Sequence, residues 1–446
     1  MSADTDLEKK TVQVDAVFGE IQEGAVNYRD VGWKGTTVIM LKAQIGLGVL
    51  SIPQVFDTVG LIPGIIILLV ISAMTAWSGW LVGVFKMRHP EVYGIDDIGR
   101  MLFGRVGYEV LGAMYALFWI FLAGSAMLSI SISLNALSSH AICTAIFVAI
   151  AAIVAFVLSS VETLSKMSFL AWIGSGSVIV AVLTVTVAVG VQGHPPAING
   201  VVPESDYKLF NNPSFADALA AISTVCLSYA GTPAFFHIMA EMREPSHYNR
   251  SFAASQVIIT IMYVVCGTVV YYYCGSHVAS PALGSAGPLM KKVCYGLALP
   301  GLIVSAVLML HLPAKHIFVR TLRGSKHLTA HTPTHWIAWI GSTLTTAVIA
   351  YVIASGIPVF SSLVSLIGAL FAITLCFQPF GCMWLYDNWH EPRTRLWWLI
   401  AAWSCFLIVG GTFLTVGGTY GSIVAIIDSY NKTGGSGAWS CANNDV

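Results

Sequence analysis

Two interruptions inside long apolar stretches hold the residues best suited to bind a small charged ligand. The first, AQIGLGVLSIP, contains Gly46, Gly48 and Pro53, and the second, SYAGTPAFF, contains Gly231 and Pro233. A broken membrane helix frees backbone N–H and C=O groups, which hydrocarbon cannot satisfy. These groups could bind the carboxylate and the ammonium of a free amino acid. Close helix packing through small residues is the alternative, but two such breaks together favour a mid-membrane substrate site.

Lys42 is a candidate for ion coupling because burial of an ionisable group inside the membrane is costly. It stands four residues before Gly46, one helical turn from the first break. Desolvation there would favour loss of its proton, as a proton carrier requires. Alternatively, its long side chain could extend to the cytoplasmic interface.

His237 and Glu241 follow the second break, four residues apart, and could form a proton relay or an inner gate. Glu241 could instead pair with Arg243 or Arg250. His311, Lys315 and His316, near the end of the eighth span, could also take part in a proton relay. Lys315 is expected to lie at the membrane interface.

The composition is that of a polytopic membrane protein. Of 446 residues, 56% are hydrophobic and 10% are charged, against about 25% charged in soluble domains. The net charge of zero excludes an ordinary basic nucleic-acid binder, and the first 34 residues show no signal-peptide core. Eleven apolar stretches are long enough to span a bilayer: 36–58, 61–84, 107–134, 141–160, 168–191, 215–240, 252–274, 296–319, 335–355, 359–385 and 396–427.

Lysine and arginine are distributed unequally between the segments that connect these spans. With a cytoplasmic N-terminus, sixteen of the 22 fall on the cytoplasmic side and four on the other. This asymmetry predicts an N-terminus inside and a C-terminus outside. A glycosylation sequon at Asn431 agrees with this orientation. Cys274 and Cys294 both fall at the ends of one outside segment, where a disulfide could form.

The chain is expected to form one transporter domain over 35–430 between a cytoplasmic tail, 1–34, and a flexible outer tail, 431–446. Residues 93–105 are predicted to form a short helix on the cytoplasmic surface, with Asp96 and Asp97 turned away from its apolar face. Segment 192–214 is expected to form an extended outer cap. Segment 275–295 is either a re-entrant turn or a thin lid.

Three motifs together carry a resemblance to a known family: LKAQIGLGVLSIPQVFDTVGLIPG, YGIDDIGRMLFGRVG and SYAGTPAFFHIMAEMREPSHYNRS. They resemble the amino acid/auxin permease family, and most of all its fungal neutral amino acid permeases. The resemblance covers about residues 30–430. It implies an all-α fold like that of the leucine transporter, with two inverted five-helix repeats, a final helix, and breaks in the first and sixth helices. It also implies amino acid uptake coupled to an ion gradient.

The resemblance assigns the substrate backbone to the two broken helices. The implied binding positions are Ile45, Gly46, Leu47 and Gly48 in the first, with Ser228, Tyr229, Ala230, Gly231 and Thr232 in the second. A sodium site in this fold needs several hard oxygen ligands. The eighth span offers only Ser305 as a hydroxyl in its core, so protons are favoured over sodium.

The predicted function is proton symport of neutral, aliphatic or aromatic, amino acids across the plasma membrane, with the vacuolar membrane as an alternative. Asp57, in the outer half of the first span, would change the selectivity if it reached the site. An amino acid sensor and a sodium-coupled symporter remain alternatives. The sequence contains no protease motif, which argues against an intramembrane protease. A haem protein would have to use His237 and His311 as its iron ligands. The Gly-x-Gly lies in an apolar span and not in the strand-helix context of a dinucleotide-binding site. We therefore expect no enzyme, no cofactor, no metal site and no nucleic-acid partner.

Overall fold

The computed structural model describes residues 14–15, 19–20, 31–45, 47–161, 164–196, 202–325, 327–328, 332–357, 359–433, 439, 441–442 and 444. Its α-helices are α1 Trp33–Gln44, α2 Leu47–Val59, α3 Leu61–Arg88, α4 Ile95–Ser138, α5 Thr144–Ser159, α6 Leu164–Gln192, α7 Phe215–Ser228, α8 Thr232–Ala240, α9 Tyr248–Cys274, α10 Pro288–Leu322, α11 Pro333–Gly356, α12 Phe360–Ile367, α13 Ile373–Cys376, α14 Gln378–Asn388 and α15 Arg395–Thr433. The short elements are strands β1 Val14–Asp15 and β2 Gly19–Glu20, 3₁₀ turns η1 Pro245–His247, η2 Gly275–His277 and η3 Ala282–Ser285, and the π-turn η4 Gly368–Ala372.

The eleven predicted spans each correspond to a helix or to a run of consecutive helices in the described chain. Nine are long and apolar enough to cross a membrane, and α1 with α2 makes a tenth that is bent by 44°. The remaining one, α5, is apolar but has only 16 residues. We call the end of the bundle at Val59 the outer end, following the predicted orientation.

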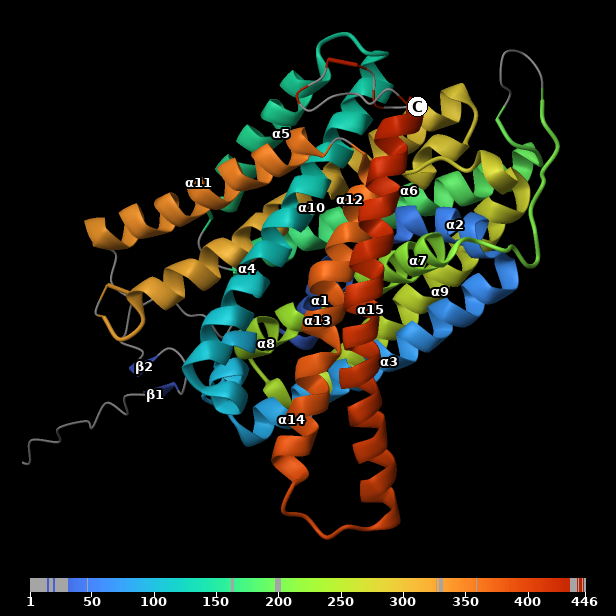
Figure 1. Ribbon diagram of the computed structural model, residues 1–446. Coiled ribbons are helices and arrows are strands. Elements are labelled where there is room, and N and C mark those ends of the chain that lie inside the picture. Colours follow the sequence, from blue (N-terminus) through green and yellow to red (C-terminus); the bar gives the residue numbers. More distant parts are fainter. Residues whose placement is uncertain are drawn as a thin grey trace, which may run out of the picture.

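The second broken span, α7 with α8, lies inside the bundle, and α15 passes in front of the bundle in the view of Figure 1. The most apolar part of Phe215–Ala240 is 94% buried, whereas the corresponding part of Arg395–Asp428 is 22% buried. Four helices, α4, α5, α10 and α11, pack against one another on one side of the centre. The break in α7–α8 is therefore enclosed by protein, as freed backbone groups at membrane depth require.

The segment before the third span is helical, as expected, but its acidic residues are not solvated. The helix α4 continues from Ile95 into the span through a kink at Gly104, whose φ is 65°. Asp96 and Asp97 are only 5% and 8% exposed. The prediction that they turn toward solvent is wrong, because side chains at the C-terminal ends of α8 and α10 cover them.

The outer segments differ in part from the predictions. The described part of the expected cap, 202–214, runs along the ends of α2 and α3, and Leu61 donates its N–H to the carbonyl of Lys208 at 3.0 Å. Segment 275–287 contains two short 3₁₀ turns and no span. The suggested disulfide is wrong, since Cys274 and Cys294 are both free thiols.

Cys143 is instead joined to Cys441, which fastens the C-terminal tail to the start of α5. The hydroxyl of Thr144 also donates to the carbonyl of Ala442 at 2.7 Å. Figure 1 shows the C-terminus at the same end of the bundle as the start of α5. The sequon at Asn431 falls in the last turn of α15.

Candidate functional site

The first break separates α1 from α2. Ile45 caps α1 with an extended backbone, φ −75° and ψ 125°, and is fully buried. Gly46 lies outside the described residues, and α2 begins at Leu47. The carbonyls at the end of α1 and the N–H groups at the start of α2 therefore have no partners within a continuous helix.

The second break is a tight turn of three residues between α7 and α8. Gly231 donates its N–H to the carbonyl of Tyr229 at 2.9 Å, and Ala230 donates to Leu227 at 3.0 Å. Pro233 stands in the first turn of α8, where its missing N–H breaks no helical bond. The turn leaves the N-terminus of α8 directed into the centre of the bundle.

The two breaks lie against each other, as the predicted site requires. A Cβ atom on Gly48 would stand 2.7 Å from the Cα of Ser228, so only glycine permits this approach. A Cβ atom on Gly231 would similarly stand 2.6 Å from the Cγ of Gln44. The glycines therefore bring the two interrupted helices into direct contact.

Tyr263 of α9 connects the two breaks, a role that its sequence context does not signal. Its hydroxyl lies 2.8 Å from the carbonyl oxygen of Ser228 and 3.1 Å from that of Gln44. Its ring packs edge-on against Tyr229, with centroids 5.1 Å apart. A tyrosine in an apolar helix gives no sign of this contact, because packing of α9 on the breaks determines it.

Tyr229 belongs to a second polar group between α3 and α9. Its hydroxyl donates to Thr260 at 3.3 Å, and the hydroxyls of Thr260 and Ser72 are 2.7 Å apart. The amide of Gln256 donates to the carbonyl of Ser72 at 3.1 Å and to the hydroxyl of Thr75 at 3.2 Å. This buried network fixes the side chain of Tyr229, the residue that directly follows α7.

Lys42 does not extend to the interface, since it is only 1% exposed. Its ammonium donates to the carbonyl of Gly301 in α10 at 2.8 Å. The hydroxyl of Ser305 donates to the same carbonyl at 3.0 Å. The structure thus brings together two of the predicted coupling residues, Lys42 and Ser305, between α1 and α10.

The predicted relay pair separates into two different contacts. Glu241 forms a buried ion pair with Lys315, which is itself buried instead of lying at the interface. His237 lies with its Nδ1 3.3 Å from the hydroxyl of Tyr115. The structure records no direct bond between His237 and Glu241 within the described chain. The guanidinium of Arg250 stacks over the ring of Trp33, 4.2 Å from its centroid.

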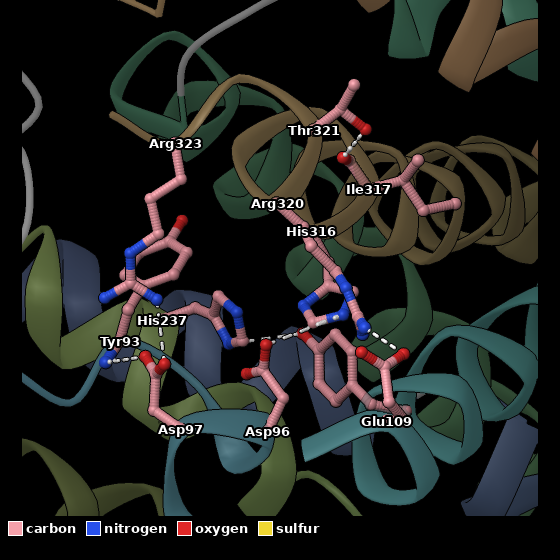
Figure 2. A network of polar contacts seen from close by, with 11 residues as sticks. Tyr93, Asp96, Asp97, Glu109, His237, His316, Ile317, Arg320, Thr321 and Arg323 are labelled. Atoms are coloured by element: carbon pink, nitrogen blue, oxygen red, sulfur yellow. Dashed lines mark hydrogen bonds and ion pairs between the residues drawn. The ribbon is translucent and has the colours of Figure 1, made fainter. Parts of the chain in front are cut away.

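Charged and aromatic side chains close the end of this region that lies opposite the outer end. Asp97 accepts from Arg323 at 2.8 Å and from the N–H of Tyr93 at 3.0 Å (Figure 2). His316 lies 4.0 Å from Asp96, and its ring centroid is 6.2 Å from that of His237. The carboxylates stand in the first turn of α4, where the helix dipole favours negative charge. This arrangement ties α4 to the ends of α8 and α10.

A cavity of about 370 Å³ opens on the other side of the breaks, between α2, α7, α12 and the end of α15. Its lining includes Ser51 and Thr224, each about one turn to the outer side of a break. Asp57 also lines it, further toward the outer end. A route from the outer surface therefore reaches close to the breaks, whereas ion pairs cover the inner side.

Solved structures share this architecture at low sequence identity. One is a nucleobase-cation-symport-1 family transporter in a closed conformation, with a TM-score of 0.53, 12% identity, and coverage of 94% of this chain and 96% of the other. Another is a sodium-coupled sialic acid symporter in an outward-open state, with a TM-score of 0.56, 11% identity and 93% coverage of both chains. The chain therefore has an all-helical, leucine-transporter-like fold with two broken helices, as predicted.

Sequence comparison identifies the family. Residues 29–424 match the profile of the transmembrane amino acid transporter protein family, and the chain belongs to this family. A "transmembrane transporter" of Gibberella moniliformis is 31% identical over 96% of this chain and 90% of its own length. The "N amino acid transport system protein" of Neurospora crassa is 32% identical over 95% of this chain and 91% of its own. The chain is therefore a multi-pass membrane protein of an amino acid transporter family, which confirms the resemblance.

Proposed function

We propose that this protein is a proton-coupled symporter of neutral amino acids that works by alternating access around the two breaks. The observation that carries the proposal is the position of Lys42, whose ammonium contacts the carbonyl of Gly301 beside the hydroxyl of Ser305. These are the hard oxygens that an alkali cation would need. A lysine that gains and loses one proton can replace such a cation in the transport cycle.

The neutral substrate class rests on the groups around the breaks. Gln44, Ser228, Tyr229, Thr232 and Tyr263 supply amide, hydroxyl and backbone groups but no charge. Helix ends can hold both charges of a zwitterion, and no side chain of this set would bind a second charge. Asp57 lines the outer cavity, where it can attract cations without contacting the bound substrate.

The proposal includes an orientation and a location. In this proposal the N-terminal tail, 1–34, lies in the cytoplasm and the transporter domain, 35–430, spans the plasma membrane. The tail 431–446 lies outside the cell. The disulfide between Cys143 and Cys441 supports this orientation, because such bonds persist in oxidising compartments. The charge asymmetry of the connecting segments supports it independently.

Uptake into proteoliposomes tests the proposal. Labelled leucine, phenylalanine, lysine and glutamate are supplied in sodium-free buffer, with and without an inward proton gradient. We expect gradient-driven accumulation of a neutral amino acid, and we expect Lys42→Met to reduce accumulation at least about tenfold while exchange of substrate continues. Lys34→Met changes an exposed lysine of the same helix and serves as the matched control.

Three outcomes would contradict parts of the proposal. Accumulation that requires sodium would overturn proton coupling, and unchanged accumulation by Lys42→Met would remove Lys42 from the mechanism. Binding without accumulation would favour a sensor.

A further inference from the structure

Gln44 has a buried side-chain amide whose hydrogen-bonding groups have no partner among the described residues. It is the last residue of α1 and is 5% exposed. Both Nε2 and Oε1 are buried and form no hydrogen bond within that part of the chain. An unpaired buried amide is costly, so such a group in a native protein calls for an explanation.

The amide lies beside the start of α8. An added Cβ on Gly231 would be 2.6 Å from the Cγ of Gln44, 3.1 Å from Nε2 and 3.2 Å from Cδ. Gly231 is the N-cap of α8, a helix of nine residues. The side chain of Gln44 therefore crosses from the first break to the second and ends against the positive end of a helix dipole.

The first turn of α8 also offers a backbone donor. The N–H groups at the start of a helix have no acceptor within it. Pro233 has no N–H, and the N–H of Gly231 is taken by the carbonyl of Tyr229. The N–H of Ala234 is taken by the carbonyl of Gly231, which leaves that of Thr232. A helix N-terminus together with an aimed, unpartnered amide is suited to bind an anion.

We propose that Gln44 is a substrate-binding residue whose Nε2 donates, together with the N-terminus of α8, to the α-carboxylate of the transported amino acid. The proposal rests on the proposed function, since it takes a neutral amino acid as the ligand. It explains why the backbone carbonyl of Gln44 is held by Tyr263 at 3.1 Å, because this bond fixes the residue next to the break. It also explains why position 231 is a glycine, since any side chain there would occupy the place of the amide.

The test compares two ligands in three forms of the full-length protein. The ligands are the neutral amino acid that the wild type takes up best and its carboxamide derivative, which keeps the ammonium but lacks the carboxylate. The proteins are the wild type, Gln44→Met, which keeps the length of the side chain without its polar atoms, and Gln378→Met, a control in α14. Affinities are measured by displacement of the labelled amino acid from purified protein.

We expect Gln44→Met to weaken binding of the amino acid about 10- to 100-fold, as loss of a hydrogen bond to a charged group does. Binding of the carboxamide should change less than about twofold, and Gln378→Met should leave both affinities unchanged. Gln44→Asn, which withdraws the amide by one methylene, should give an intermediate loss and replaces Gln44→Met if that variant does not fold.

The inference is overturned if a folded Gln44 variant binds the amino acid within about twofold of the wild type, or if both ligands lose affinity equally. A wild type that binds no neutral amino acid would overturn the proposed function and this inference together. The two failures are therefore distinguishable.

Discussion

The hydroxyl of Tyr263 lies 2.8 Å from the carbonyl oxygen of Ser228, the last residue of α7. The same hydroxyl lies 3.1 Å from the carbonyl oxygen of Gln44, the last residue of α1. One side chain of an unbroken helix thus holds the ends of both broken helices. Any movement of one break relative to the other must lengthen at least one of these contacts.

Tyr263→Phe removes this connection and keeps the ring. We expect the free energy of unfolding to fall by about 1–3 kcal/mol, because the two buried carbonyls lose the one hydroxyl donor that they share. The transport rate should also change, since the breaks are no longer held together. Thermal unfolding and initial uptake rates measure the two effects. Tyr273→Phe, ten residues later in α9, is the matched control, and equal behaviour of the two variants would contradict the prediction.

Glu241→Gln should destabilise the protein by about 3–5 kcal/mol, because the buried ammonium of Lys315 then loses its carboxylate partner. The double variant Glu241→Gln with Lys315→Met should recover much of this loss, since it removes both charges. The apparent melting temperature reports each step. A double variant that melts no higher than the single one would show that the ion pair is not the source of the effect.

Reduction of the Cys143–Cys441 disulfide should lower the apparent melting temperature. The bond closes a loop across 298 residues, and loss of a native disulfide costs about 2–5 kcal/mol in small secreted domains. Cys441→Ser should reproduce the effect and make the protein insensitive to reductant. Cys405→Ser changes an exposed free thiol and should have no effect. Continued sensitivity of Cys441→Ser to reductant would refute the assignment.

The attachment of segment 202–214 to the turn η2, which contains Ser276, should weaken in acid. The N–H and the hydroxyl of Ser276 donate to Asp206, each at 2.7 Å, and lower the pKa of this carboxyl. A carboxyl whose pKa is lower in the folded than in the unfolded chain stabilises the fold at every pH above its unfolded-state pKa, which is about 4. This stabilisation is lost as the pH falls through the folded-state pKa. Cleavage of the segment by an acid-active protease should therefore accelerate below about pH 4.

Asp206→Asn is the comparison for this acid effect. It should be cleaved at a rate that varies less with pH, because the residue no longer titrates. An equal acceleration in Asp206→Asn and in the wild type would mean that another group controls the segment.

The spans, the breaks and the family could be read from the sequence because each depends on local properties. About twenty consecutive apolar residues predict a membrane span whatever the rest of the chain does. Gly-x-Gly, or Gly followed by Pro, interrupts a helix because of the backbone conformation of those residues themselves. The two breaks together predicted a mid-membrane site, and the resemblance added the fold in which they interrupt the first and sixth helices. Lys42 could be named as a candidate for coupling for the same reason, since a charge in an apolar stretch is visible without any partner.

The partners of these residues depended on contacts between distant segments. Glu241 was expected to pair with an arginine close in sequence, but the packing of α8 against α10 gives it Lys315. Asp96 and Asp97 read as the polar face of a surface helix, and the ends of other helices bury them. Cys274 and Cys294 were close enough in sequence to suggest a bond, whereas the structure brings Cys441 back to Cys143.

The sequence by itself determined that this chain crosses the membrane and where two of its helices break. Only the tertiary structure decided that Tyr263 joins the breaks, that Gln44 reaches Gly231 and that Lys42 meets Gly301. The physical reason is the range of the interactions. Hydropathy and backbone conformation act within one segment, whereas a hydrogen bond across the bundle exists only after the helices have packed.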